Sequence, residues 1–279
     1  MRLPEYVASY LLANDVSART AADYRWIATY FDRDTHLPLD EFTAAKINAY
    51  LVALKERGWL PPSLRGMRTK LLVLWRAAYR DGYTDNPADG DRVRKIKVPR
   101  PNPIGLTPED MRSLIAYCER ELRHHLISVR VPTGDYLAAL FAFLWDTGMR
   151  VGDAVAMEFE DIETGTVTWL QSKTGVWHQA VLSAQTRDRI ERIRLPVRAV
   201  IWPRPARNKT ALFRLIKRAF LGAGLKGTSK YIRRGVATDV YLSGRDPAQA
   251  LGHVPGSRVA YRHYVSAEAQ LEPVSPTPL

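Results

Sequence analysis

Apolar positions in the first hundred residues recur every three to four residues, the spacing of amphipathic helices. In VSARTAADYRWIATYF they follow Ser17, a residue type that caps helix starts. In TAAKINAYLVALKERG they follow Thr43 in the same way. A third segment, PPSLRGMRTKLLVLWRAAYRDG, repeats the pattern and is expected to become helical after its two prolines. The first hundred residues therefore predict four or five helices in a small bundle with a basic outer surface.

Prolines and positive charges interrupt this pattern near residue 100. The stretch RVRKIKVPRPNPIGLTPED contains Pro99, Pro101 and Pro103, which favour an extended connector. Thr107 followed by Asp110 then has the spacing of a helix-capping pair. We expect a helical domain at 1–95, a Pro-rich basic linker at 96–106 and a second domain at 107–279. The linker charges fit two interpretations, a segment that crosses a DNA backbone or a connector that is simply solvated.

The second domain combines helical patterns with one pair of strands. DYLAALFAFLWDTG is apolar on every side, as in a buried helix. TVTWLQSKTGVWHQAVL has two β-rich arms around SKTG and predicts a β-hairpin. Helical patterns resume in three segments, SAQTRDRIERI, KTALFRLIKRAFLGAG and SKYIRRGVATDVYLSG. The fold expected is mainly α with a small β-hairpin, followed by a tail, EPVSPTPL, that is either disordered or a docking segment.

Composition excludes several classes of protein. No apolar run approaches the roughly 20 residues that a membrane span needs, and Pro4 and Glu5 come too early for a signal peptide. We therefore expect a cytoplasmic protein with no membrane partner. Cys118 is the single cysteine, so an intrachain disulfide and a cysteine metal cage are excluded.

The charge balance indicates the class of partner. There are 41 Lys and Arg residues against 29 Asp and Glu, a formal net charge of +12. Basic side chains release condensed counterions when they contact phosphates, so double-stranded DNA is the leading candidate. A basic enzyme without a nucleic-acid partner is the alternative.

Five short motifs follow one another along the second domain: DTGMRVGDAVAMEFEDIE, QSKTG, SKYIRRGVAT, LGH and RHYVS. In this order and spacing they resemble the active-site motifs of the tyrosine recombinase (phage integrase) family. The helical N-terminal segment and the Pro-rich connector are similar to that family's core-binding domain and linker. The resemblance implies an N-terminal helical core-binding bundle and a mixed α+β catalytic domain.

The resemblance also points to six catalytic positions, which are Arg150, Lys173, Lys230, Arg233, His253 and Tyr264. Asp153 matches the acidic residue that buttresses the first arginine in the family. Lys230 is a departure, because the family usually has histidine there, so the identity of any general base stays open. Each residue has an alternative structural role, such as an Arg150–Asp153 ion pair or a buried imidazole at His253.

These residue types suit phosphodiester cleavage for reasons independent of the family. In-line attack loads negative charge onto the phosphate, and the guanidinium groups of Arg150 and Arg233 can clamp its nonbridging oxygens. A tyrosine hydroxyl has a pKa of about 10 and needs nearby cations to become a good nucleophile. Lys173 at a hairpin tip can protonate the departing 5′ oxygen, and His253 can donate a hydrogen bond to the phosphate. A charged Lys230 cannot accept a proton, so it is interpreted as an electrostatic contact.

Two tyrosines compete for the role of nucleophile. Tyr264 lies eleven residues after His253 and Tyr261 lies eight after it. On one helix the two would share roughly a face, so spacing does not separate them. RHYVS most resembles the family's nucleophile segment, so we favour Tyr264.

The function expected is site-specific recombination or integration through a 3′-phosphotyrosyl intermediate, by a tetramer on two DNA sites and without metal or other cofactor. A catalytically silent DNA-binding relative is one alternative, which the departure at Lys230 keeps open. A relaxing topoisomerase of type IB-like chemistry is the other.

Overall fold

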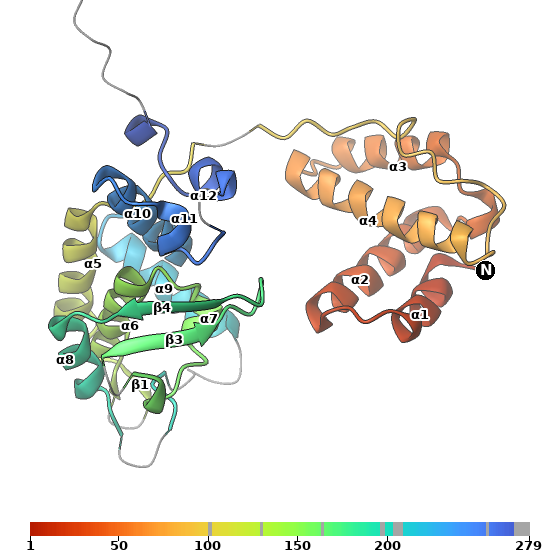
Figure 1. Cartoon of the computed structure of the whole chain (residues 1–279). Helices are drawn as coiled ribbons and strands as arrows, with labels where there is room; N and C mark the ends of the chain where they lie inside the picture. The colour runs from red at the N-terminus through yellow and green to blue at the C-terminus, as the bar shows by residue number, and fades with distance from the viewer. Residues whose placement is uncertain are drawn as a thin grey trace, which may run out of the picture. The chain divides into compact units, whose positions relative to one another are not determined.

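The computed structural model describes residues 1–99, 102–128, 131–162, 165–195, 199–202, 209–254 and 257–270. It forms two compact units, Met1–Arg100 and Pro101–Leu279 (Figure 1). Each unit has a hydrophobic core of its own. The tail at 272–279 and connector residues 100 and 101 lie outside the described residues.

The first unit is built from helices that pack around large apolar side chains. Ser17 caps one helix by accepting from the Thr20 amide, and Thr43 caps another by accepting from the Lys46 amide. In order, the elements are α1 (Leu3–Ala13), α2 (Ala18–Thr35), the 3-10 turn η1 (Leu39–Glu41), α3 (Ala44–Glu56) and α4 (Pro61–Arg80). The helices expected from the apolar spacing are therefore present.

The start of α4 differs from the expectation. The helix begins at Pro61, and both prolines form part of its first turn. The reason is that the first amides of a helix have no intrahelical acceptor, so proline loses nothing there and its fixed φ suits the helix.

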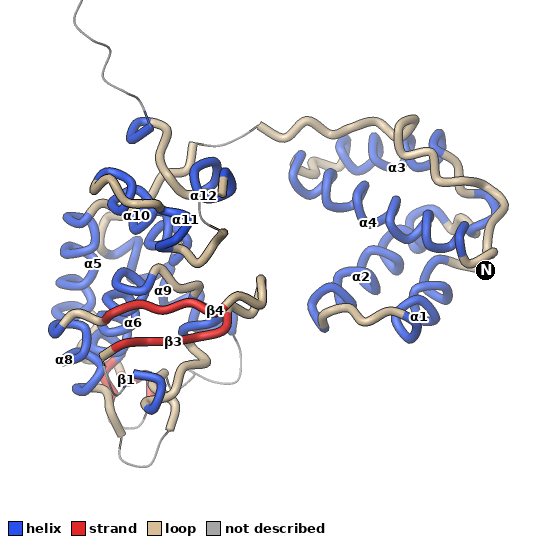
Figure 2. The backbone as a smooth tube through the Cα atoms, in the orientation of Figure 1, coloured by secondary structure: helices blue, strands red, loops and turns tan. Residues whose placement is uncertain are grey.

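The second unit is mainly helical with two small antiparallel pairs of strands (Figure 2). Its elements are α5 (Pro108–Glu121), β1 (Leu126–Ser128), β2 (Val131–Pro132), α6 (Thr133–Thr147), α7 (Val151–Ala154), η2 (Glu160–Ile162), β3 (Thr166–Leu170), β4 (Trp177–Val181), α8 (Ala184–Arg192), α9 (Lys209–Gly222), α10 (Ser229–Leu242), α11 (Pro247–Ala250), α12 (Arg258–His263) and η3 (Glu268–Gln270). Thr107 and Asp110 form the expected capping box at the start of α5.

Helix α6 is the central element of this unit. Most of its side chains are buried, and it contacts α5, α8 and α10. The predicted hairpin is present as β3 and β4, paired from Thr166 opposite Val181 to Leu170 opposite Trp177. Strand β4 also contacts α6, so the hairpin is fixed against the most buried helix of the unit.

The C-terminal helices α10, α11 and α12 form a smaller apolar cluster. Val236, Val240, Leu251 and Val265 are buried there, and the ring of Tyr264 packs against them. Helix α12 ends at His263, so Tyr264 is its C-cap and does not lie within the helix. The expectation that Tyr261 and Tyr264 share a helix face is therefore wrong, because the chain leaves the helix between them.

Candidate active site

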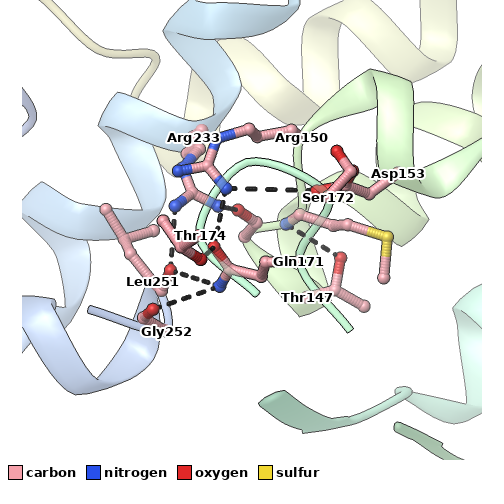
Figure 3. Close-up of polar contacts among 11 residues, drawn as sticks. Thr147, Arg150, Asp153, Gln171, Ser172, Thr174, Arg233, Leu251 and Gly252 are labelled. Carbon is pink, nitrogen blue, oxygen red and sulfur yellow. Dashed lines mark hydrogen bonds and ion pairs between the residues drawn. The ribbon is translucent and has the colours of Figure 1, made fainter. Parts of the chain in front are cut away.

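Arg150 is placed by the end of the buried helix α6. Gly148 ends that helix with a left-handed φ of 58°, and Arg150 immediately precedes α7. The Arg150 Nη1 group donates to Gln171 Oε1 over 2.6 Å and lies 4.0 Å from Asp153 Oδ2 (Figure 3). The ion pair with Asp153 is therefore present. The hydrogen bond to Gln171 joins Arg150 to the turn of the hairpin.

Asp153 connects α7 to the same turn. The residue is 8% exposed, and its carboxylate oxygen Oδ1 accepts a hydrogen bond from the Ser172 hydroxyl. The other carboxylate oxygen, Oδ2, is the one that lies 4.0 Å from Arg150 Nη1. Asp153 thus lies beside Arg150, as the resemblance predicted, and joins α7 to the turn through Ser172.

Arg233 lies on α10 and is only 4% exposed. Its Nη1 donates to the Gly148 carbonyl and its Nη2 donates to the Leu251 carbonyl over 2.8 Å. Burial and the charge of Arg150 lower the pKa of Arg233 to about 10, so the guanidinium is still charged at neutral pH. Arg233 is therefore a buried cation and not part of a solvated basic helix face.

The ring of Tyr264 lies against two of the predicted site residues. Arg233 Cζ is 5.3 Å from the ring centroid, and the imidazole of His253 is 5.8 Å away, centroid to centroid. Burial raises the pKa of Tyr264, but nearby positive charges outweigh burial and hold that pKa below its ordinary value. These charges belong to Arg233, Arg150 and Lys230. Tyr264 is thus a tyrosine whose phenolate is electrostatically favoured.

Tyr261 has the opposite surroundings. Its hydroxyl donates to Asp246 Oδ1 over 3.3 Å, and its ring packs edge-on against Tyr241. Burial and the negative charge of Asp246 raise the pKa of Tyr261. The two tyrosines that spacing could not separate therefore differ in the sign of their pKa shift.

His253 follows the short helix α11. Gly252 adopts a left-handed φ of 63°, consistent with the helix-ending role that its position suggests. Burial, then the charges of Arg233 and Arg150, lower the pKa of His253, so its imidazole is favoured in the neutral form. Its Nε2 is buried and has no hydrogen-bond partner among the described residues.

The two lysines are exposed at the edge of this group. Lys173 lies in the turn between β3 and β4, and Lys230 lies in the first turn of α10. Their charges reach the cluster, since Lys173 lowers the pKa of His253 and Lys230 lowers that of Tyr264. The structure thus brings Arg150, Arg233, His253 and Tyr264 together and leaves both lysines free to approach a bound molecule.

Sequence reasoning missed Gln171. This residue is 1% exposed and contacts Arg150 directly. The available signal was a polar residue at the end of an apolar strand, in the QSKTG motif, at a position where a buried amide must find partners.

The described residues contain neither a cluster suited to a metal ion nor a membrane-spanning helix. Within the described ranges, no group of three or more His, Cys, Asp or Glu side chains is arranged to hold a metal ion. Nor does any helix among those residues have the length and apolar character to cross a bilayer.

Comparison with known proteins gives consistent results. The model of the phage integrase family matches residues 105–270. Among solved structures, a lambda integrase (75–356) dimer bound to a COC′ core site is similar, with a TM-score of 0.78 and 20% identity over 99% of this chain and 100% of that one. A lambda integrase tetramer bound to a Holliday junction has a TM-score of 0.73 and 20% identity over 94% and 76%. The Tn1549 transposon integrase (82–397) with circular intermediate DNA has a TM-score of 0.68 and 14% identity over 97% and 98%. No curated protein matches the chain.

Proposed function

The chain belongs to the phage integrase family of tyrosine recombinases, and on that premise we propose that it is a site-specific recombinase that cleaves and rejoins DNA through a 3′-phosphotyrosyl intermediate. The observation that carries the proposal is Tyr264, a tyrosine beside Arg233 and His253 whose pKa is held low by surrounding cations. A nucleophilic tyrosine needs such an environment, because its neutral hydroxyl attacks phosphorus poorly.

In the reaction, Tyr264 ionises and its phenolate oxygen attacks the scissile phosphorus. The new bond is Tyr264 Oη to phosphorus, and the bond that breaks joins phosphorus to the 5′ oxygen. Lys173 protonates that leaving oxygen from the exposed turn of the hairpin. The proton of Tyr264 passes to solvent, and the charge of Lys230 stabilises the phenolate. Attack by a 5′ hydroxyl of the partner strand reverses these steps and releases Tyr264.

The phosphate itself is held by Arg233, which is buried, by Arg150, which is partly exposed, and by the imidazole of His253. Arg233 Nε and His253 Nε2 are both buried without partners among the described residues. Both nitrogens can therefore donate to a phosphate without breaking a hydrogen bond that the described residues make. Nonbridging phosphate oxygens accept from the Arg233 Nε–H and from His253 in the tautomer that is protonated at Nε2. Arg150 supplies a second guanidinium for the charge that develops in the transition state.

We assign residues 1–95 as the core-binding domain, 96–106 as the linker and 107–279 as the catalytic domain. DNA is the substrate, and a tetramer on two DNA sites in the cytoplasm is the working form. The net charge of +12 supports DNA as the substrate. A lambda integrase tetramer bound to a Holliday junction is a structural relative, and it supports the tetramer.

The proposal is tested by covalent trapping. A duplex site is found by selection, nicked beside the scissile phosphate and incubated with the protein in EDTA. We expect a covalent protein–DNA adduct. No adduct on a site that the protein binds would support a catalytically silent DNA-binding relative. Cleavage with relaxation of supercoiled DNA, but without synaptic complexes, would support a relaxing topoisomerase.

DNA affinity is expected to fall steeply with salt, because binding releases counterions from each contacted phosphate. Six such contacts lower affinity by about 10³-fold between about 50 mM and 200 mM salt. The measurement is the equilibrium binding constant across that range. A nearly flat dependence would contradict phosphate contact as the main source of affinity.

Replacing Lys230 with Gln is expected to move the rising limb of the cleavage pH profile to higher pH. The charge of Lys230 lowers the pKa of Tyr264, so its removal raises that pKa and reduces the phenolate fraction at neutral pH. Because the group is exposed, the rate at neutral pH should fall only about 2- to 5-fold. Single-turnover cleavage from pH 6 to 10 measures the shift. Lys226→Gln, an exposed lysine in the loop before α10, is the matched control and should leave the limb in place.

A further inference from the structure

The side chain of Gln171 uses both ends of its amide. Oε1 accepts from Arg150 Nη1 over 2.6 Å and from the Thr174 hydroxyl over 3.4 Å. Nε2 donates to the Leu251 carbonyl over 2.9 Å and to the Gly252 carbonyl over 3.3 Å (Figure 3). A buried side chain with this many partners has little freedom to move.

These partners come from segments that are distant in sequence. Arg150 is 21 residues away, and Leu251 is 80 residues away. The Leu251 carbonyl also accepts from Arg233 Nη2, so Gln171 and Arg233 share one acceptor. The second carbonyl that Gln171 contacts belongs to the residue immediately before His253.

The backbone at residue 252 is shaped around this amide. Gly252 has a φ of 63°, and a Cβ atom there would lie 1.9 Å from Gln171 Nε2. The same atom would lie 3.0 Å from Cγ of His178. A side chain at 252 would displace the amide, so the glycine that precedes His253 is required by Gln171 as well as by the turn.

Only an amide satisfies both kinds of partner. The acceptor end meets a guanidinium, and the donor end meets two carbonyls. A carboxylate would keep the first contact, lose the second, and neutralise part of the charge of Arg150.

We propose that Gln171 is a positioning residue that holds Arg150, Arg233 and the His253 segment in one arrangement around the scissile phosphate. Through the turn that it begins, Gln171 also fixes the base of the loop that carries Lys173. The inference rests on the proposed recombinase function, because positioning has meaning only where these groups act on one phosphate.

The test compares Gln171→Met and Gln171→Glu with the wild type on the nicked duplex. Met keeps the length and removes every hydrogen bond of the amide, whereas Glu keeps the acceptor and adds charge. Single-turnover adduct formation at saturating protein gives the rate, a binding titration gives DNA affinity, and thermal unfolding confirms that each variant is folded. Gln179→Glu makes the same change on β4, at an exposed residue whose amide donates to Thr168.

Both Gln171 variants are expected to cleave about 100-fold more slowly, the effect of misplacing a catalytic group by about 1 Å, with DNA affinity within about 3-fold of the wild type. Gln171→Glu should also move the rising limb of the cleavage pH profile, measured by single-turnover cleavage from pH 6 to 10, to higher pH, because its carboxylate opposes ionisation of Tyr264. Gln171→Met adds no charge and should leave that limb in place. Gln179→Glu should stay within about 2-fold of the wild-type rate.

The inference is overturned if the wild type forms the adduct and the Gln171 variants form it at nearly the same rate. A loss of DNA affinity as large as the loss of rate also overturns it, since that indicates a structural role. Absence of an adduct from the wild type overturns the proposed function, and the inference with it.

Discussion

The Tyr264→Phe protein is expected to bind its DNA site with nearly wild-type affinity and to form no covalent adduct. Removing a nucleophile lowers the rate by at least about 10⁴-fold, because no other group can form the phosphoryl bond. Tyr261→Phe should retain the adduct, because that hydroxyl is bonded to Asp246 and its pKa is raised. Both variants are incubated in EDTA with the nicked duplex, and the adduct is separated by denaturing electrophoresis.

The comparison between these two variants is informative because each removes the same atom, the hydroxyl oxygen, from one of two tyrosines that lie three residues apart in the sequence. DNA binding by each variant is the control for folding. An adduct that persists in Tyr264→Phe and disappears in Tyr261→Phe would assign the nucleophile to the other tyrosine. Loss in both variants with binding intact would mean that the Tyr261 contact with Asp246 is needed to place Tyr264.

The Arg233→Lys protein is expected to lose about 10²- to 10³-fold in cleavage rate, the effect of removing one preorganised donor to a developing anion. Arg233 donates to the Gly148 and Leu251 carbonyls and has Nε left for a phosphate. A lysine ammonium keeps the charge but lacks the planar fork that serves all three acceptors. Single-turnover cleavage at saturating protein measures the loss without the contribution of binding.

The neighbouring residue on α10 gives a matched control. Arg234 lies over the ring of Tyr231, with Nη1 3.5 Å from the Ile104 carbonyl, so Arg234→Lys makes the same chemical change next to the site. It should cleave within about 2-fold of the wild type. Because Arg233 is buried, thermal unfolding must show that Arg233→Lys is folded at the assay temperature. A folded Arg233→Lys protein that cleaves as fast as the wild type would remove Arg233 from the phosphate site.

Much of the fold could be predicted from local sequence patterns. Ser17, Thr43 and Thr107 cap helices where the sequence places them, since capping depends on a residue and the three that follow it. The arms around SKTG pair as expected because strand alternation is also local. The short pair β1 and β2 was not predicted, because two or three residues carry too little pattern.

The candidate site was predicted in part. The resemblance of five motifs to those of the tyrosine recombinase family indicated Arg150, Arg233, His253 and Tyr264, and these four lie together. Gln171 was missed because its importance lies in partners 21 and 80 residues away. No periodicity or spacing rule relates positions at such separations.

The sequence by itself determined the helical character of the chain, the hairpin and the cationic balance, because each follows from residue type and short-range spacing. The candidate site residues were indicated by the resemblance of five motifs to those of a known family. Only the tertiary structure decided how each candidate is surrounded. It separated Tyr264 from Tyr261 by placing one beside Arg233 and the other beside Asp246. The physical reason is that burial and electrostatic potential are sums over neighbours in space, and folding brings these neighbours together from distant positions of the second unit.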